Sequence, residues 1–535
     1  MSGGFIQPGP RLGNQYRDDA VLRAFLAWRM PAEVLAGVEA HLEHLGERAR
    51  GDFLAMAAEA EAHPPVLRPY DAWGRRIDEI AVSAGWRALE RAAAQEGLVA
   101  AAYERRQGPW SRLYQGSLAY LFHASSAYFS CPLAMTDGAA RLFEVHGSGP
   151  LREEVLRHLT SRDPDEFWTS GQWMTEKIGG SDVSATQTVA RPRPDGACEL
   201  YGDKWFSSAT TAQMAMTLAR IEGDPPGNRG LSLFFVKTRR PDGGLNGITI
   251  HRLKDKLGTR ALPTAELGLS GTEARPVGER GRGVPLIATL FNVTRLWNAV
   301  CAVAAMRRAY ALARDYADRR QAFGRRLIDH PLHARTLEDL DCEIWGSTFL
   351  TLHLLGLQGL DEAGEADAGC RLLLRILTPI AKLYTAKQAL GVVSECLESL
   401  GGAGYVEDNG LGRLLRDTQV LSIWEGTTNV LSLDVLRAMR REGAGEALEQ
   451  DVSARLAAVR DPGLGAARAR LLERWSTCRA TLSGLDAEPD AGQQRARSLA
   501  FELARIYAAS LLLEYLQAVP QPRAAPLLRF WTGAG

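Results

Sequence analysis

The stretch Ser422-Ile423-Trp424-Glu425-Gly426-Thr427-Thr428-Asn429-Val430 places one carboxylate between apolar residues and a run of small polar ones. Partial desolvation by Ile423 and Trp424 would raise the pKa of this carboxylate towards the range useful for proton abstraction. The small residues that follow leave room for a flat cofactor. A glutamate in a polar turn is more often a solvated or capping side chain, so Glu425 becomes a candidate base only through the other motifs of the chain.

Two of these motifs stand near the middle of the chain. Trp173-Met174-Thr175-Glu176-Lys177-Ile178-Gly179-Gly180-Ser181 begins like a strand and ends in a glycine pair. The backbone amides of that pair and the Ser181 hydroxyl could hold a pyrophosphate or the edge of a ring. Lys204-Trp205-Phe206-Ser207-Ser208 offers an aromatic plate and two hydroxyls on a strand. The ordinary alternatives are a β-turn for the first motif and a core tryptophan for the second.

Two further motifs end long helical patterns. Arg319-Arg320-Gln321-Ala322-Phe323-Gly324-Arg325 could bring an Arg or Gln to a phosphate and a Phe to a ring, although basic residues and Gly are common at helix ends. Leu400-Gly401-Gly402-Ala403-Gly404-Tyr405 contains more glycines than a helix end needs, which indicates close approach of the backbone to another group. No Gly-x-Gly-x-x-Gly follows a strand, so a Rossmann dinucleotide fold is not supported.

Hydrophobic periodicity divides the chain into four parts. Helical spacing of apolar residues gives way near residue 170 to β-type runs separated by Pro, Gly and Asp turns, and long helical patterns return after residue 283. The final part is helical again, with breaks at Asp461-Pro462-Gly463 and at 485–489, and looks appended to the core. The predicted domains are 1–168, helical; 169–284, β; 285–440, a four-helix bundle; and 441–535, a helical extension.

Composition indicates an ordinary globular protein without a nucleic-acid bias. The 63 basic residues balance 63 acidic ones, and because only seven of the basic residues are Lys, clusters of Arg carry little weight. Seven scattered cysteines without a Cys-x-x-Cys pair predict reduced thiols and no metal site. The N-terminal residues lack the layout of a signal peptide, and we find no run of about 18 apolar residues. We therefore expect a cytoplasmic protein that does not contact a membrane.

The order and spacing of the motifs make the chain resemble the acyl-CoA dehydrogenase family from about residue 100 to residue 440. Met-Thr-Glu…Gly-Ser-Asp, Lys-Trp-Phe-Ser, Arg-x-x-Phe-Gly, Leu-Gly-Gly-x-Gly-Tyr and Trp-Glu-Gly-Thr carry this resemblance. His63 to Asp78, Arg252 to Thr259 and the tail beyond residue 440 resemble the AidB-like branch, which is associated with the adaptive response to alkylation. The resemblance implies an α+β multidomain fold with a helical N-terminal domain, a central β-barrel domain and a C-terminal helical bundle that carries a helical extension.

The resemblance also implies an activity. FAD-dependent family members remove the α-proton of an acyl-CoA thioester while the β-hydrogen leaves as hydride to flavin N5, and the electrons pass to a partner flavoprotein. Glu425 would be the base, a backbone amide near it would polarise the thioester carbonyl, and the assembly would be a homotetramer. The residues implied to hold FAD are Met174, Thr175, Gly180 and Ser181; Trp205 and Ser207 beside the isoalloxazine; Arg320, Phe323, Gly401 and Gly402 from a neighbouring subunit; Ile423 beside the base; and Gly426, Thr427 and Asn429 at the adenosine end.

Two departures from the family pattern concern these cofactor contacts. Glu398 stands where many relatives carry Gln, and Ala322 replaces a hydroxyl residue in Arg-x-x-Phe-Gly. Both substitutions put the contacts at those two positions in doubt.

The AidB-like branch implies an alternative function, which is binding of double-stranded DNA through the C-terminal part together with weak dehydrogenase activity. Residues 437–535 contain 14 Arg, no Lys and 11 acidic residues, and this small surplus does not require a phosphate partner. Arg437, Arg440 and Arg441 form the candidate DNA-binding patch, for which a solvated helix face is at least as good an explanation. The sequence does not give the acyl chain length.

Overall fold

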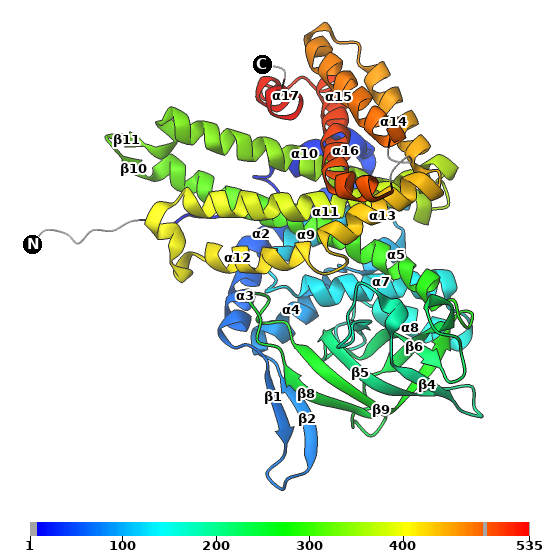
Figure 1. Cartoon of the computed structure of the whole chain (residues 1–535). Helices are drawn as coiled ribbons and strands as arrows, with labels where there is room; N and C mark the ends of the chain where they lie inside the picture. Colours follow the sequence, from blue (N-terminus) through cyan, green and yellow to red (C-terminus); the bar gives the residue numbers. More distant parts are fainter. Residues whose placement is uncertain (1–7, 485–488, 534–535) are drawn as a thin grey trace, which may run out of the picture. The chain divides into compact units, whose positions relative to one another are not determined.

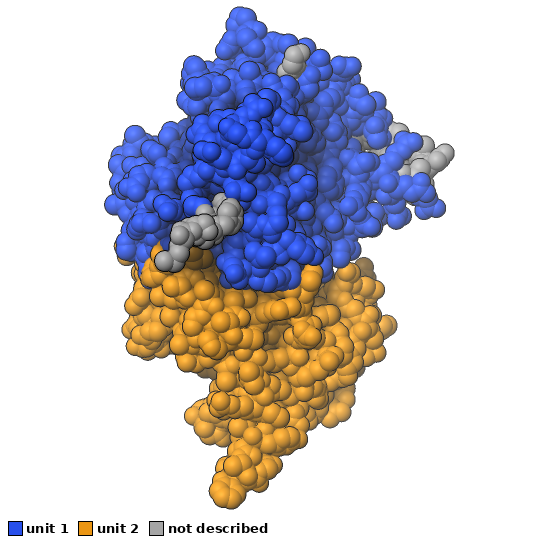
Figure 2. Space-filling view, turned by 90° about the vertical axis from the view of Figure 1, so that its left-hand side faces the viewer, with its two compact units in different colours: residues 1–50, 107–124, 298–535 blue, residues 51–106, 125–297 orange. Residues whose placement is uncertain are grey.

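The computed structural model describes residues 8–484 and 489–533, which form two compact units (Figure 2). Unit 1 combines residues 1–50, 107–124 and 298–535, and unit 2 combines residues 51–106 and 125–297. Each unit is assembled from separated stretches of chain, whereas the four predicted domains are continuous, so the domain boundaries stay a prediction. The first seven residues, and residues 485–488 of the second predicted break in the tail, lie outside the described residues.

The predicted succession of helical, β and helical segments is confirmed (Figure 1). In unit 2, a helical stretch precedes the strands and one long helix follows them. Helix α9 (Gly283–Arg319) begins in unit 2 and continues into unit 1, because the boundary between the units falls after Trp297. The other α-helices of unit 2 are α3 (Asp52–Ala62), α4 (Ala84–Gln95), α5 (Ala100–Glu104), α7 (Ser130–His146) and α8 (Gly149–Leu159).

A seven-stranded sheet forms the centre of unit 2. Five strands pair in a closed cycle: β4 with β5, β5 with β9, β9 with β7, β7 with β6, and β6 with β4. Of the other two strands, β3 pairs with β6, and β8 pairs with β9. The closed pairing makes this segment a small barrel, as predicted. The strands are β3 (Ser170–Trp173), β4 (Val189–Pro192), β5 (Cys198–Ser208), β6 (Met214–Ile221), β7 (Leu231–Lys237), β8 (Ile248–Leu253) and β9 (Thr264–Val277).

Alternate residues of the barrel strands enter two different hydrophobic cores. On β7, Leu233 and Phe235 pack in one core together with residues of α7, α8 and α9 such as Phe143. The intervening residues Phe234 and Val236 pack in the second core, with residues of the opposite strands. Because side chains of a strand alternate between its two faces, one apolar run serves both cores, and both faces of the sheet are covered.

A β-hairpin interrupts the mostly helical N-terminal segment. It consists of β1 (Val66–Tyr70) and β2 (Arg76–Ala81), and it includes most of the His63 to Asp78 stretch that resembles the AidB-like branch. The Asp78 carboxylate accepts a hydrogen bond of 3.0 Å from the Ile250 amide, and Arg76 donates one of 3.0 Å to the Ile250 carbonyl. The hairpin is therefore anchored to β8 at the edge of the sheet.

Long helices build unit 1, and α10 and α11 lie side by side in it (Figure 1). A buried ion pair joins α6 to α10, since Arg112 Nε and Nη2 donate to the two Glu362 carboxylate oxygens over 2.9 and 2.8 Å. The helices are α1 (Ala20–Arg29), α2 (Ala32–Arg50), α6 (Ser111–His123), the rest of α9, α10 (Pro331–Glu362), α11 (Ala368–Glu398), α12 (Leu411–Thr418), α13 (Thr428–Arg441), α14 (Ala444–Ala458), α15 (Gly465–Gly484), α16 (Pro489–Ala518) and α17 (Ala524–Thr532).

The C-terminal extension packs into the core of unit 1. Its helix α16 contacts α10, α11, α13 and α14, and α17 contacts α10. Trp531 of α17 is 1% exposed and donates from Nε1 to the Cys342 carbonyl over 2.7 Å. Gly346, one turn further along α10, makes room for this indole, because a Cβ there would lie 2.0 Å from the ring. The extension is thus part of the same compact unit as the bundle.

Helix α9 is long and apolar enough to cross a membrane by length and composition alone, with an 18-residue window of mean hydropathy 1.4. The sequence prediction that no such segment exists overlooked this helix. In the structure, 67% of the window is buried inside the protein. The core helix of a folded protein has the same properties, so the hydropathy of α9 is weak support for a membrane span.

Substitution of Gly346 tests the docking of the extension. Gly346→Ala should lower the free energy of unfolding by about 1 to 3 kcal/mol, because the new methyl group overlaps Trp531. Gly391→Ala is the matched control: this glycine is exposed on α11 with nothing within 4 Å of a Cβ, and alanine should stabilise the helix by up to about 1 kcal/mol. Urea unfolding measures both values, and equal effects of the two substitutions would contradict the packing of α17 on α10.

Candidate functional site

Glu425 lies in a tight turn before α13. The turn follows a 3₁₀ helix, η7 (Gln419–Ser422), and Glu425 and Gly426 adopt positive φ angles of 56° and 99°. Glycine suits the second position because a Cβ there would also lie 2.9 Å from Leu431. A glutamate in the left-handed region is uncommon and costs conformational energy, so the surrounding structure must hold it there.

A lysine and an asparagine hold the turn from two neighbouring helices. Lys382 of α11 is fully buried, and its ammonium group donates to the carbonyls of Trp424 and Gly426 over 2.6 and 2.7 Å. These carbonyls belong to the residues on either side of Glu425. The Trp424 indole donates to Asn298 Oδ1 of α9 over 2.6 Å. The geometry of the turn is therefore set by α9 and α11.

The sequence analysis did not single out Lys382 or Asn298. A signal was present for the lysine, because Lys382 interrupts the apolar run Ile380-Ala381-Lys382-Leu383 in the middle of a long helix. A charged residue in such a place is buried only when it has hydrogen-bond acceptors. The asparagine carries no comparable signal.

The exposure of the turn agrees partly with the prediction. Glu425 and Trp424 are half-buried, but Ile423 is 54% exposed and does not shield the carboxylate. Thr427 is the N-cap of α13 without a side-chain cap bond, and the side chain of Asn429 accepts a hydrogen bond from Arg497 of α16 over 3.2 Å.

The remaining predicted residues of unit 1 lie on two surface turns. Arg320 and Phe323 belong to the hairpin of β10 (Gln321–Ala322) and β11 (Arg325–Arg326), where Phe323 is 97% exposed with a φ of 50°. Gly401 and Gly402 begin the 3₁₀ helix η5 (Gly401–Tyr405), and both are exposed with nothing within 4 Å of a Cβ. Each turn presents backbone and aromatic surface to solvent.

In unit 2 the two central motifs lie against each other. The Trp205 amide on β5 donates to the Thr175 carbonyl over 2.9 Å. Met174, directly after β3, is 6% exposed and packs in the core shared with α7 and α8. Gly180 lies close to Thr175, since a Cβ on it would be 2.4 Å from Thr175 Oγ1, and Ser181 follows on the exposed side of the same loop. The structure thus brings together the predicted residues Met174, Thr175, Gly180 and Trp205.

A buried ion pair fixes this arrangement. Lys204 Nζ lies 2.9 Å from Glu176 Oε1, and the two side chains are 0% and 5% exposed. Burial alone would raise the pKa of Glu176, but the Lys204 charge and hydrogen bonds from Thr188 and Gln187 lower it, so the carboxylate is ionised. Both residues lie inside the sequence motifs, which by themselves indicate no role for them.

Two buried polar atoms near the predicted residues have no hydrogen-bond partner in the described part of the chain. One is Ser207 Oγ on β5, in a residue that is 1% exposed, and the other is Asn298 Nδ2, in a residue that is 3% exposed. Buried polar groups are normally satisfied, so each of these two atoms, one in unit 2 and the other in unit 1, is a candidate to bind a polar ligand.

The candidate DNA-binding residues lie at the end of α13. Arg437 Nη2 donates to Asp434 Oδ1 over 2.5 Å, and its Nε lies 3.6 Å from Glu442. Arg440 and Arg441 are exposed. At least one of the three charges is therefore compensated within the unit.

Among the described residues, no group of three or more His, Cys, Asp or Glu side chains could hold a metal ion.

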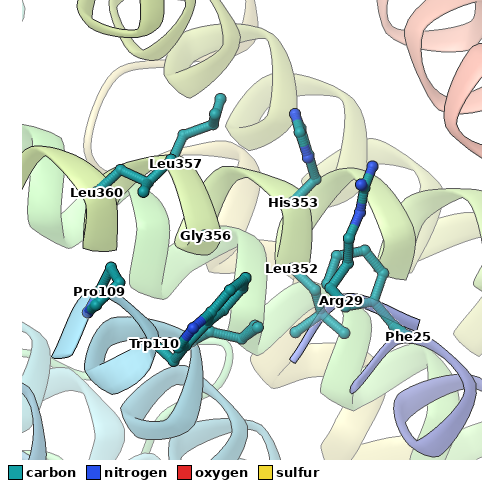
Figure 3. A pocket seen from close by; sticks show the side chains of 10 residues that line it. Phe25, Arg29, Pro109, Trp110, Leu352, His353, Gly356, Leu357 and Leu360 are labelled. Carbon is teal, nitrogen blue, oxygen red and sulfur yellow. The ribbon is translucent and has the colours of Figure 1, made fainter. Parts of the chain in front are cut away.

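Unit 1 also contains an apolar cavity of about 140 Å³ between α1, α6 and α10 (Figure 3). Arg29 and His353 lie at one end of it, and Trp110 and Pro109 lie at the other. None of the predicted site residues lines it. This cavity is therefore separate from the candidate site.

Comparisons with known proteins identify the family. The description "Adaptive response protein AidB N-terminal domain" matches residues 8–166, "Acyl-CoA dehydrogenase, middle domain" matches 171–272, and "Acyl-CoA dehydrogenase, C-terminal domain" matches 281–440. Acyl-CoA dehydrogenase family member 11 of Caenorhabditis elegans is 42% identical over 530 residues, which cover 96% of this chain and 86% of the relative. The chain belongs to the acyl-CoA dehydrogenase family. AidB of Escherichia coli strain K12 is 34% identical over 455 residues, or 82% of this chain and 80% of AidB.

Solved structures agree with this assignment. The complex of Caenorhabditis elegans ACDH-11 with C11-CoA has a TM-score of 0.96 at 40% identity and covers 100% of this chain and 93% of that chain. The apo form of Bd2924 has a TM-score of 0.89 at 52% identity and covers 96% and 100% of the two chains. The family, the AidB-type N-terminal domain and the acyl-CoA dehydrogenase fold, all predicted from the motifs, are confirmed.

Replacement of Lys382 tests how the Glu425 turn is held. Lys382→Met leaves the Trp424 and Gly426 carbonyls without their donor, so the free energy of unfolding should fall by about 1 to 3 kcal/mol. Hydrogen exchange of the amides in residues 423–428 should become at least about tenfold faster. Lys387→Met, a half-buried lysine on the same helix, is the control and should change neither value. Wild-type exchange in Lys382→Met would show that another contact holds the turn.

Proposed function

We propose that Glu425 is the catalytic base of an FAD-dependent acyl-CoA dehydrogenase. The observation that supports this role is the turn itself, in which a glutamate is kept in the left-handed region by a buried ammonium group on its two neighbouring carbonyls. Strained residues held in this way cluster at functional sites. Family membership supplies the reaction, which is α,β-dehydrogenation of an acyl-CoA thioester.

Glu425 takes the α-proton of the thioester in this proposal. An α-proton next to a thioester is weakly acidic, so the base must be held at one position and the carbonyl oxygen must be stabilised as it gains charge. The rigid turn fixes the backbone of the base, and a backbone amide of the same segment is the proposed donor to the carbonyl. Glu425 is half-buried, so it is neither sealed in the core nor fully solvated.

FAD is the proposed cofactor, and when bound it accepts the β-hydrogen as hydride. Thr175, Gly180 and Ser181 are proposed to hold it through a loop whose backbone the Lys204–Glu176 pair fixes. Ser207 would give its unsatisfied hydroxyl to the flavin, and Trp205 would pack on the ring. The remaining residues proposed to contact FAD are Met174, Ile423, Gly426, Thr427 and Asn429.

A homotetramer is the proposed assembly. Phe323 and Tyr405 are 97% and 89% exposed, which suits burial against a second subunit rather than exposure to water. Arg320, Gly401 and Gly402 lie on the same two turns and would reach the FAD of that neighbour.

We further propose that a partner flavoprotein accepts the electrons and that the protein is located in the cytoplasm.

The proposed substrate is an acyl-CoA, whose chain length is left to experiment. ACDH-11, which was solved in complex with C11-CoA, is 40% identical to this chain, and the match covers the full length of this chain. An eleven-carbon acyl-CoA is therefore the first compound to test.

DNA association through Arg437, Arg440 and Arg441 is the alternative proposal. The AidB-type N-terminal domain supports it, whereas the pairing of Arg437 with Asp434 weakens it. Duplex binding that falls steeply with added salt would favour this function, and binding that is absent at low salt would exclude it.

Glu425→Gln tests the base. The variant should bind FAD like the wild type but reduce it with acyl-CoA at least about 100-fold more slowly, because the amide cannot accept the proton. It should also fail to exchange the substrate α-proton with deuterium from solvent, which separates proton abstraction from hydride transfer. Stopped-flow absorbance and mass spectrometry measure the two rates.

The control is Glu365→Gln, which makes the same change at an exposed position between α10 and α11 and should behave like the wild type. Wild-type α-proton exchange in Glu425→Gln would place the base at another residue.

A further inference from the structure

Trp205 and Phe206 occupy a β-bulge. On β5, Lys204 pairs with Leu267 and the next paired residue, Ser207, pairs with Ala265, so that Trp205 and Phe206 together oppose Glu266 of β9. Consecutive residues of a regular strand point to opposite faces. Here one cation contacts both rings, since Lys254 Nζ lies 3.5 Å from the Trp205 ring centroid and 4.6 Å from that of Phe206. The bulge turns two aromatic side chains towards the same ammonium group.

Glu266 clamps this ammonium group. Lys254 Nζ donates to Glu266 Oε1 over 2.6 Å, and Arg252 Nε donates to the same oxygen over 2.7 Å. The side chains of Lys254 and Glu266 are each 10% exposed. Burial would raise the pKa of Glu266, but the hydrogen bonds from Lys254 and Arg252 lower it, so the carboxylate stays ionised. The cation above Trp205 is thus held in place from the opposite strand.

We infer that Lys254 is a positioning residue: clamped by Glu266, it holds the Trp205 indole in the orientation required against the flavin and places a positive charge beside that cofactor. The inference rests on the proposed function, because the contact of Trp205 with flavin is part of that proposal. It also gives a role to the stretch from Arg252 to Thr259, for which the sequence analysis found none beyond a resemblance.

A second lysine near the same ring supplies an internal comparison. Lys177 Nζ lies 5.7 Å from the Trp205 centroid, its side chain is 57% exposed, and it pairs with Asp203 over 2.8 Å. A cation–π contact weakens with distance and with hydration, so Lys254 should dominate over Lys177. Lys254 and Lys177 therefore differ in their distance from the Trp205 ring and in their exposure to water, while the residue type and the ring are the same.

The first test uses the full chain before FAD is added, labelled with 5-fluorotryptophan and observed by ¹⁹F NMR. Trp205→Phe assigns one of the twelve tryptophan signals. Lys254→Met should shift or broaden that signal, Lys254→Arg should largely restore it because a guanidinium also stacks on indole, and Lys177→Met should leave it unchanged. An unchanged signal in Lys254→Met would overturn the inference.

The second test uses the same variants with FAD bound. Lys254→Met should weaken FAD binding between about 3-fold and 30-fold, because the Trp205 indole is no longer held in its binding orientation before FAD arrives, and should lower the midpoint potential of the flavin because a nearby positive charge is lost. Lys254→Arg should retain both values. A moved tryptophan signal with unchanged affinity and potential would make the clamp purely structural and would overturn the role towards the flavin. Failure of the proposed function is recognised separately, because the wild type would then bind no FAD or would bind FAD that no acyl-CoA reduces, and both results are independent of Lys254.

Discussion

A buried ammonium group must find hydrogen-bond acceptors inside the protein, and in this chain that requirement fixes the backbone on which the chemistry depends. Lys382 finds its acceptors in the carbonyls of Trp424 and Gly426. Those bonds hold Glu425 in a conformation that an isolated turn would rarely adopt. Lys204 makes the equivalent contribution in unit 2, where its pairing with Glu176 joins the loop after β3 to β5. Both lysines are fully buried, so neither contact competes with water.

The choice of lysine at these positions is informative because the chain otherwise uses arginine. Lys is present only seven times among 63 basic residues, yet four of the seven make hydrogen bonds of 2.6 to 2.9 Å in buried or partly buried contacts. These are Lys204, Lys254, Lys256 and Lys382. A compact ammonium group fits between two carbonyls of one turn, whereas the planar guanidinium needs more room and a different donor geometry. At Lys382 the lysine therefore marks a position where shape, as well as charge, is constrained.

The sequence predicted the order of segments, the barrel and the family, because hydrophobic periodicity and ordered motifs are local properties. It also predicted that Trp173 to Ser181 and Lys204 to Ser208 belong to one site. It could not predict that Asn298 and Lys382 hold the Glu425 turn, or that Glu266 holds the lysine above Trp205, since these residues are far from the motifs in sequence. The docking of Trp531 on Gly346 was missed for the same reason. The β1–β2 hairpin was missed because its short strands are mostly exposed or half-buried and carry no clear hydrophobic pattern. Ile423 was expected to shield Glu425 and is instead exposed, because neighbours in sequence do not determine which face of a turn is buried.

An anaerobic absorbance titration of the FAD-loaded wild-type protein with acyl-CoAs of different lengths, including an eleven-carbon chain, tests the central claim most directly. If Glu425 is the base of an FAD-dependent dehydrogenase, at least one of these thioesters should bleach the flavin band with one equivalent of substrate. A fully FAD-loaded protein whose flavin band is unchanged by all of them would contradict the account.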